Sequence, residues 1–117
     1  MAKFAWHDLT VPDADGVKDF YQAVVGWSPQ PLNMGDYDDY VMSDGEEPVA
    51  GVCHNRGSNA SLPPVWLVYI EVENVDVAIA ACEANGGEKI SQIFSSGESR
   101  YCVLKDPAGA AFAVSGK

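Results

Sequence analysis

The stretch LTVPDADGVKDFYQAVVGW, residues 9–27, decides the fold, because IEVENVDVAIAACEANGGE, residues 70–88, repeats its pattern. An offset of 61 residues (72 − 11) aligns the two stretches. Under this offset the paired positions are Val11 with Val72, Asp15 with Asp76, and Gly26 with Gly87. Two copies of a unit of roughly 60 residues nearly fill the chain, so the sequence predicts a paired repeat. Such a repeat usually holds a shared cleft between its copies, where function is sought.

Each copy is predicted to contain a strand, a helix and then three strands. Asp13 or Asp15 can cap the first helix, and Asn74 or Asp76 the second. Glycine ends both helices, at Gly26 and at Gly86-Gly87. Their expected apolar stripes are Val17, Phe20, Tyr21 and Val24, and Val75, Ala78, Ile79 and Cys82. The expected strands are 4–11, 27–32, 37–43 and 49–54, then 64–72, 89–94, 99–105 and 111–115.

The repeat places the whole chain in one α+β domain, residues 1–117, with the element order βαβββ–βαβββ. The stretch NRGSNASLPP, residues 55–64, is the one that resembles a linker. We therefore expect unit one at residues 1–56, a linker at 57–63 and unit two at 64–117.

The composition of the chain limits the classes of partner that it could bind. A net charge of −10 disfavours nucleic acid and acidic membrane surfaces, which attract clustered Lys and Arg. No apolar run approaches the ~20 residues of a membrane span. Three cysteines without a C-x-x-C spacing indicate neither a disulfide framework nor a zinc clip. We expect a cytoplasmic protein.

The segments WHDLTVPD (6–13), DFYQAVVGW (19–27) and DPAGAAFAV (106–114) resemble the vicinal oxygen chelate superfamily of glyoxalases, bleomycin-resistance proteins and extradiol dioxygenases. The resemblance covers essentially the whole chain and is closest to small glyoxalase-like members. It implies two tandem units that form one half-open, eight-stranded cleft with the helices outside. Function does not follow from that fold, so the cleft is read residue by residue.

The metal ligands of the superfamily are missing from the matching positions. In metal-using members, the first and last strands of each unit supply His, Glu or Gln to a divalent ion. The matching positions hold Trp6, Gly51, Leu67 and Ala113, and none of these side chains can ligate a cation. Strand parity places His7 on the helix face, partly buried at the edge of the core, and His54 is expected in an exposed loop. The acidic segment 35–40 lacks the pattern of a calcium loop and is expected to be a turn into a strand. We therefore expect no metal and no cofactor.

Parity also selects the residues that would face the cleft and bind a ligand. On the seventh strand, matching to its neighbours favours the face of Arg100, Cys102 and Leu104 over that of Tyr101 and Val103. The cysteines are expected to be buried and structural rather than reactive. The predicted ligand-binding residues are Trp6, Asp8, Cys53, Tyr69, Glu71, Arg100 and Cys102.

Three functions fit these observations. The first is a metal-free protein that binds a small apolar or aromatic molecule between large side chains such as Trp6 and Tyr69. The second is an enzyme of the same superfamily, a lyase, isomerase or dioxygenase type, acting on a small oxygenated substrate; its metal-free form would use Asp8 or Glu71 as a base. The third is a degenerate structural or dimerisation module, such as a homodimer built on an exposed sheet edge.

Overall fold

The computed structural model describes residues 2–117, which form two compact units. The N-terminal unit comprises residues 7–66. The C-terminal unit comprises residues 2–6 together with 67–117. The expected linker therefore falls inside the N-terminal unit, where Gly57–Asn59 forms a short 3-10 helix.

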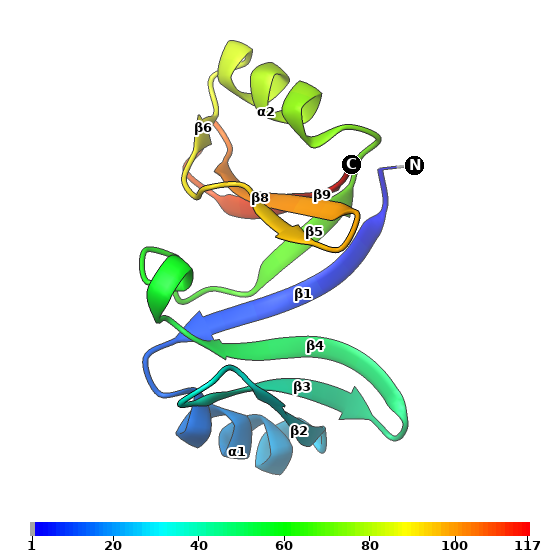
Figure 1. Ribbon diagram of the computed structural model, residues 1–117, viewed down its shortest axis with the longest axis vertical. Helices are drawn as coiled ribbons and strands as arrows, with labels where there is room; N and C mark the ends of the chain where they lie inside the picture. Colours follow the sequence, from blue (N-terminus) through cyan, green and yellow to red (C-terminus); the bar gives the residue numbers. More distant parts are fainter. Residues whose placement is uncertain (1) are drawn as a thin grey trace. The chain divides into compact units, whose positions relative to one another are not determined.

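The N-terminal unit has one helix beside a four-stranded sheet (Figure 1). Its sheet order is β2-β3-β4-β1, with β1 parallel to β4 and the other neighbours antiparallel. The elements are β1 (Phe4–Val11), α1 (Ala14–Val25), β2 (Ser28–Asn33), β3 (Asp38–Asp44) and β4 (Glu47–His54). The first residues of β1 belong to the C-terminal unit.

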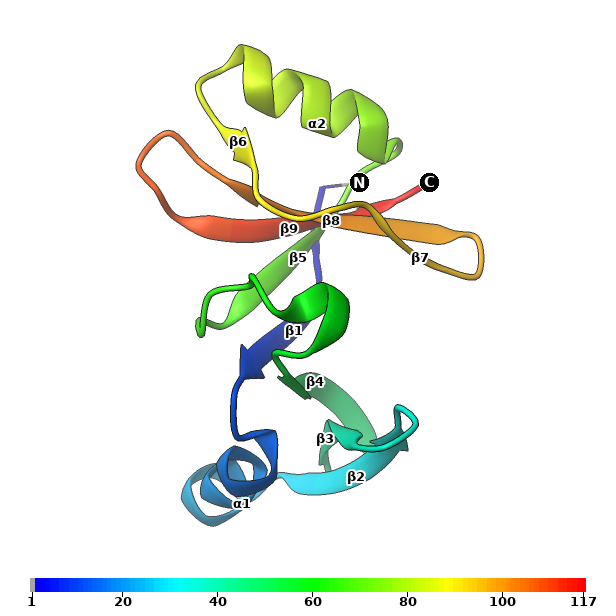
Figure 2. The ribbon, with the colours of Figure 1, turned by 60° about the vertical axis from the view of Figure 1, so that its left-hand side comes forward.

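The C-terminal unit repeats this topology, with α2 lying along one face of its sheet (Figure 2). Strand β5 runs parallel to β9, β9 pairs antiparallel with β8, and both β6 and β7 pair with β8. The elements are β5 (Leu67–Glu71), α2 (Val75–Ala84), β6 (Glu88–Lys89), β7 (Phe94–Ser96), β8 (Ser99–Lys105) and β9 (Ala111–Gly116). The predicted α+β class with two βαβββ units is confirmed.

Both helices begin and end where the sequence predicts. The Asp13 carboxylate accepts the Gly16 N–H at 3.0 Å, and the Asn74 side chain accepts the Val77 N–H at 3.0 Å. Gly26 ends α1 in the left-handed conformation at φ 81°, and Gly86 has φ 92° just after α2. These positive φ values explain the glycines, because other residues rarely adopt them. No helix in residues 2–117 is long and apolar enough to cross a membrane.

Each helix covers its own apolar core. Under α2, the residues Val75, Ile79, Cys102, Leu104 and Val114 are buried together, and Ala78 and Cys82 pack against them. Under α1, Val17 and Tyr21 pack on a core of Ala14, Tyr40, Met42, Ala50 and Val52. The stripe predicted for α1 is partly wrong, because Phe20 is 57% exposed and Val24 is 61% exposed. Of the predicted stripe, only Val17 and Tyr21, four residues apart, pack on this core.

One predicted strand is interrupted. Instead of a single strand over 89–94, β6 and β7 are separate short strands. The reason lies at Ser91, whose hydroxyl accepts the Val103 N–H at 2.9 Å. A side chain thus takes the place of a backbone partner and breaks the ladder along β8.

Candidate functional site

Strand pairing in the C-terminal unit fixes which predicted site residues face away from α2. Val114 is buried under α2, and its neighbours along β9, Ala113 and Ser115, face the other way. Ala113 is paired with Tyr69, and Ser115 with Glu71. Tyr69 and Glu71 therefore share the sheet face opposite α2. Other groups cover this face at Tyr69, whose side chain is only 8% exposed.

An aromatic cluster lies on this face. The ring centroids of Tyr69 and Tyr101 are 5.7 Å apart, and those of Phe94 and Tyr101 are 5.0 Å apart. Sequence reasoning missed Tyr101 and Phe94 as members. The signal was weak, because β8 is apolar on both faces and its alternation does not select one of them.

The face assigned to Arg100 and Cys102 is wrong. Cys102 is paired with Val114 and is buried under α2. Arg100 shares that parity, and its guanidinium forms a bidentate ion pair with Asp76 of α2 at 2.9 and 3.0 Å. This pairing lowers the pKa of the exposed Asp76 carboxyl and raises the pKa of Arg100. Both residues thus serve the packing of α2, on the opposite side from Tyr69 and Glu71.

A hollow of about 530 Å³ adjoins Glu71 and Ser115. Its walls come from the ends of β5 and β9 and from the turn between β7 and β8. The lining residues are Glu71, Val72, Glu73, Glu98, Ser99, Ser115, Gly116 and Lys117. Three of these eight residues are acidic, Glu71, Glu73 and Glu98, and Lys117 is the single cation among the eight. Of the predicted residues, only Glu71 borders this hollow, while Trp6 lies at the start of the same unit, half-buried.

In the N-terminal unit, Asp8 and Cys53 lie on the sheet face away from α1. Asp8 is paired with Gly51 and Thr10 with Cys53, whereas their strand neighbours Val11 and Val52 pack toward α1. Burial raises the pKa of the Cys53 thiol, and the negative charges of Asp8 and Asp39 raise it further. A thiol held in its protonated form is a poor nucleophile, which supports a structural role.

The residues do not fit the metal site that the superfamily uses. At the matching positions, Leu67 and Ala113 are fully buried hydrocarbon, Gly51 has no side chain, and Trp6 offers only an indole N–H donor. Within residues 2–117, no group of three His, Cys, Asp or Glu side chains converges closely enough to hold a metal ion.

The second histidine was misplaced by sequence reasoning. His54 is 7% exposed rather than lying in an open loop, because it still belongs to β4 and shares the α1 face with Val52 and Ala50. Strand parity could have found this placement. His7, in contrast, is exposed although partial burial was expected, since the pairing of β1 with β4 begins only at Asp8.

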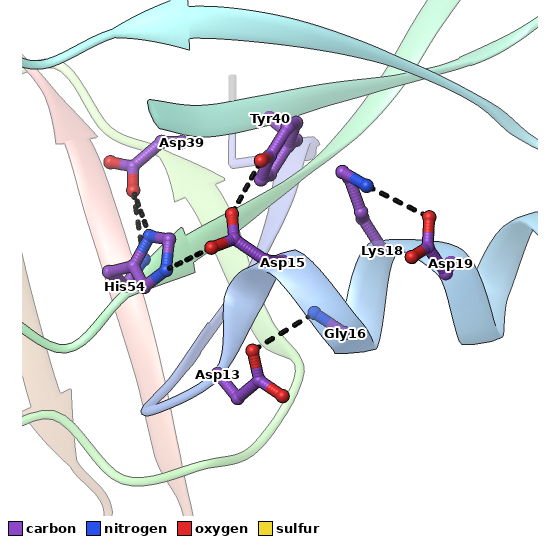
Figure 3. A network of polar contacts seen from close by, with 8 residues as sticks. All are labelled: Asp13, Asp15, Gly16, Lys18, Asp19, Asp39, Tyr40 and His54. Atoms are coloured by element: carbon purple, nitrogen blue, oxygen red, sulfur yellow. Dashed lines mark hydrogen bonds and ion pairs between the residues drawn. The ribbon is translucent and has the colours of Figure 1, made fainter. Parts of the chain in front are cut away.

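His54 stands between two carboxylates, one from α1 and one from β3 (Figure 3). Its Nε2 atom is 3.8 Å from Asp15 Oδ2, and its Nδ1 atom is 3.5 Å from Asp39 Oδ1. The backbone N–H of His54 donates to Asp39 Oδ1 at 2.8 Å, which fixes the buried Asp39. The Tyr40 hydroxyl donates to Asp15 Oδ1 at 2.5 Å. We call these four residues, Asp15, Asp39, Tyr40 and His54, the His54 cluster.

Because its hydroxyl donates to Asp15, Tyr40 is expected to ionise at a higher pH than an ordinary tyrosine. The bond itself, then burial and the nearby negative charges, raises the pKa of Tyr40 from 10.0 to about 12. A raised pKa in the folded state means that the stabilisation is fully present below pH 10 and is lost as the pH rises through about 12. A spectroscopic pH titration of tyrosinate should show one late-ionising tyrosine, absent from Tyr40→Phe and moved to lower pH in Asp15→Asn. Identical titration of wild type and Asp15→Asn would contradict the assignment.

Comparison with known proteins agrees with the topology. The family model described as "Glyoxalase-like domain" matches residues 6–115. CFP32 of Mycobacterium bovis is 32% identical over 111 residues, covering 91% of this chain and 42% of that protein. Anthracycline biosynthesis protein DnrV of Streptomyces peucetius is 32% identical over 126 residues, covering 94% of this chain and 45% of that protein.

This chain thus spans less than half the length of these relatives. A solved structure of a glyoxalase/bleomycin resistance protein/dioxygenase superfamily member from Vibrio splendidus has a TM-score of 0.63 at 10% identity and covers 100% of both chains, a likeness of fold. The match over residues 6–115 and the paired βαβββ units place this chain in the glyoxalase-like domain family.

Proposed function

We propose that this chain binds a small aromatic or apolar molecule, without a metal ion, as a binding protein of the glyoxalase-like family. The observation that carries the proposal lies on the C-terminal sheet face opposite α2. There the aromatic cluster of Tyr69, Tyr101 and Phe94 lies on the same sheet as the hollow that Glu71 borders. Apolar walls with a few polar groups are the usual composition of small-molecule sites.

The charge of the hollow limits the ligand. Glu71, Glu73 and Glu98 outnumber Lys117, and the chain carries a net charge of −10. Carboxylates repel anions, so the favoured ligand is neutral or cationic, such as a phenol or a polycyclic aromatic. The name of one relative, the anthracycline biosynthesis protein DnrV, is consistent with a ligand of this kind.

The metal-free part of the proposal rests on donor chemistry. Trp6, Gly51, Leu67 and Ala113 replace the family's ligands with groups that cannot coordinate a divalent cation. Stoichiometric zinc, nickel, iron or manganese in the purified protein would overturn it.

Binding should be measurable with 1-naphthol as the probe. We expect a saturable rise in melting temperature, because a ligand that binds only the folded state stabilises it. Trp6→Ala and Tyr101→Leu should each weaken binding about tenfold, since large aromatic walls dominate such contacts. Phe4→Ala is the matched control, because Phe4 lies on the same strand as Trp6 but is 69% exposed. No stabilisation by 1-naphthol or larger aromatics would overturn the ligand class. If the wild-type protein converted an aromatic compound and Glu71→Gln did not, the enzyme alternative would be established instead.

A homodimer and a cytoplasmic location remain predictions. Edge-to-edge pairing at β2 is disfavoured, because Pro29 and Pro31 remove backbone donors and proline is a known guard of sheet edges. A dimer would therefore use another surface, and sedimentation at micromolar concentration would detect it. The free thiols of Cys53, Cys82 and Cys102 suit a reducing compartment.

A further inference from the structure

We infer that the N-terminal unit carries a second binding site, for the ammonium group of a small organic amine, between His54 and Asp15. This site lies in a different unit from the proposed aromatic site and does not depend on it. Three independent observations carry the inference: the gap in the His54 cluster, the comparison with the other repeat, and the hollow beside the gap.

We call the space beside His54 Nε2 and Asp15 Oδ2 the gap. These two atoms face each other, and both are assigned as hydrogen-bond acceptors. The Nδ1 atom of His54 is buried, has no hydrogen-bond partner within residues 2–117, and faces the Asp39 carboxylate. Both neighbouring carboxylates only accept, and the single proton of a neutral imidazole is assigned to Nδ1 because Asp39 is the nearer of the two, at 3.5 Å against 3.8 Å for Asp15. Nε2 is then an acceptor, and it faces Asp15 Oδ2 at 3.8 Å. That distance is too long for a direct hydrogen bond, but one donor that lies to the side of the two atoms, about 2.8 Å from each, can reach both.

The C-terminal repeat shows what the gap lacks. Asp76 is the counterpart of Asp15 under the 61-residue offset, and each lies in the first turn of its helix. Asp76 receives a permanent cation, the Arg100 guanidinium. Asp15 forms no ion pair with Lys or Arg in the part of the chain that the structure describes, and the nearby Lys18 ammonium pairs with Asp19 at 2.8 Å. Within residues 2–117, Asp15 therefore lacks the Lys or Arg ion pair that Asp76 makes, although the Lys18 ammonium lies 5.0 Å from the centroid of the neighbouring Tyr40 ring.

A hollow of about 500 Å³ opens beside the gap and suits a positively charged ligand. Its lining residues are Asp15, Gly35, Asp36, Tyr37, Asp38, His54 and Arg56. The Tyr37 ring makes a cation–π contact with the Arg56 guanidinium, which lies 4.2 Å from the ring centroid. The same guanidinium lies 3.4 Å from the Asp36 carboxylate. Three carboxylates against one guanidinium leave the hollow negative. An ammonium group fits better than a metal ion, because it donates to both facing acceptors and needs no third ligand.

Proton NMR with benzylamine can test the site, because His54 and His7 are the only histidines and His7 is exposed. At about pH 8, benzylamine should shift the His54 C2 proton saturably and leave His7 unmoved. Benzyl alcohol, the uncharged analogue, should shift neither. Asp15→Asn should weaken benzylamine binding about tenfold, as loss of a charged hydrogen bond does.

Asp76→Asn is the matched control and should leave the shift of His54 by benzylamine unchanged. If circular dichroism shows Asp15→Asn unfolded, Asp36→Asn, at an exposed side chain, should still weaken binding about threefold. Equal shifts with benzyl alcohol, no shift with benzylamine, or binding unchanged in both aspartate variants would overturn the inference. So would a stoichiometric shift of His54 by Zn²⁺ that benzylamine does not reverse.

Discussion

Leu104→Ala is expected to lower the free energy of unfolding by about 3 kcal/mol, within the usual range for removing a buried leucine side chain. Leu104 is 1% exposed and packs under α2 with Ile79, Val114 and Cys102. Truncation leaves a cavity that rigid strands on either side cannot close. A loss of this size should lower the melting temperature by roughly 10 °C.

The same variant tests the corrected face of β8. Urea unfolding should show a lower midpoint with an unchanged slope. Lys105→Ala is the matched control, because Lys105 is the next residue on β8 and its ammonium makes only a 3.7 Å contact with Glu88 at the surface. It should change stability by less than about 0.5 kcal/mol. Equal effects of the two substitutions would show that Leu104 does not face the core.

Gly116→Ala should destabilise the C-terminal unit by about 3 kcal/mol, the upper end of the cost of overpacking. A Cβ atom at position 116 would collide with the carbonyl oxygen of Val72 and lie 3.1 Å from its carbonyl carbon. The obstacle is backbone, and it cannot swing aside as a side chain could. The Val72 N–H also donates to Ser115 O at 2.8 Å, so moving Val72 would break a neighbouring hydrogen bond.

Thermal unfolding of Gly116→Ala should be compared with that of Ser115→Ala. The serine substitution removes one oxygen at the adjacent residue and adds no atom, so its effect on stability should be small. Because Gly116 also borders the hollow near Glu71, a folded Gly116→Ala protein should bind 1-naphthol more weakly than wild type. A melting temperature equal to that of wild type would contradict the close approach.

Several features of this protein follow from sequence alone. The 61-residue repeat, the caps at Asp13 and Asn74, and the stop at Gly26 all depend on contacts within a few residues, so local chemistry determines them. The family match follows from the same local pattern. The residue types at the positions that match the family's ligands, Trp6, Gly51, Leu67 and Ala113, are also read from the sequence, and their side chains offer no atom that can ligate a divalent cation.

Tertiary structure decided which faces these residues use. Strand β8 carries apolar residues on both faces, so its sequence does not show which face is buried under the helix. Only its pairing with β9 shows that Cys102 lies beside Val114 under α2. The break between β6 and β7 depends on Ser91 reaching Val103, twelve residues away. The His54 cluster joins α1, β3 and β4, and no local pattern records that Asp15, Asp39 and His54 meet. Contacts between distant segments depend on how whole helices and strands pack together. That packing depends on residues throughout the chain, so no short stretch of sequence predicts these contacts.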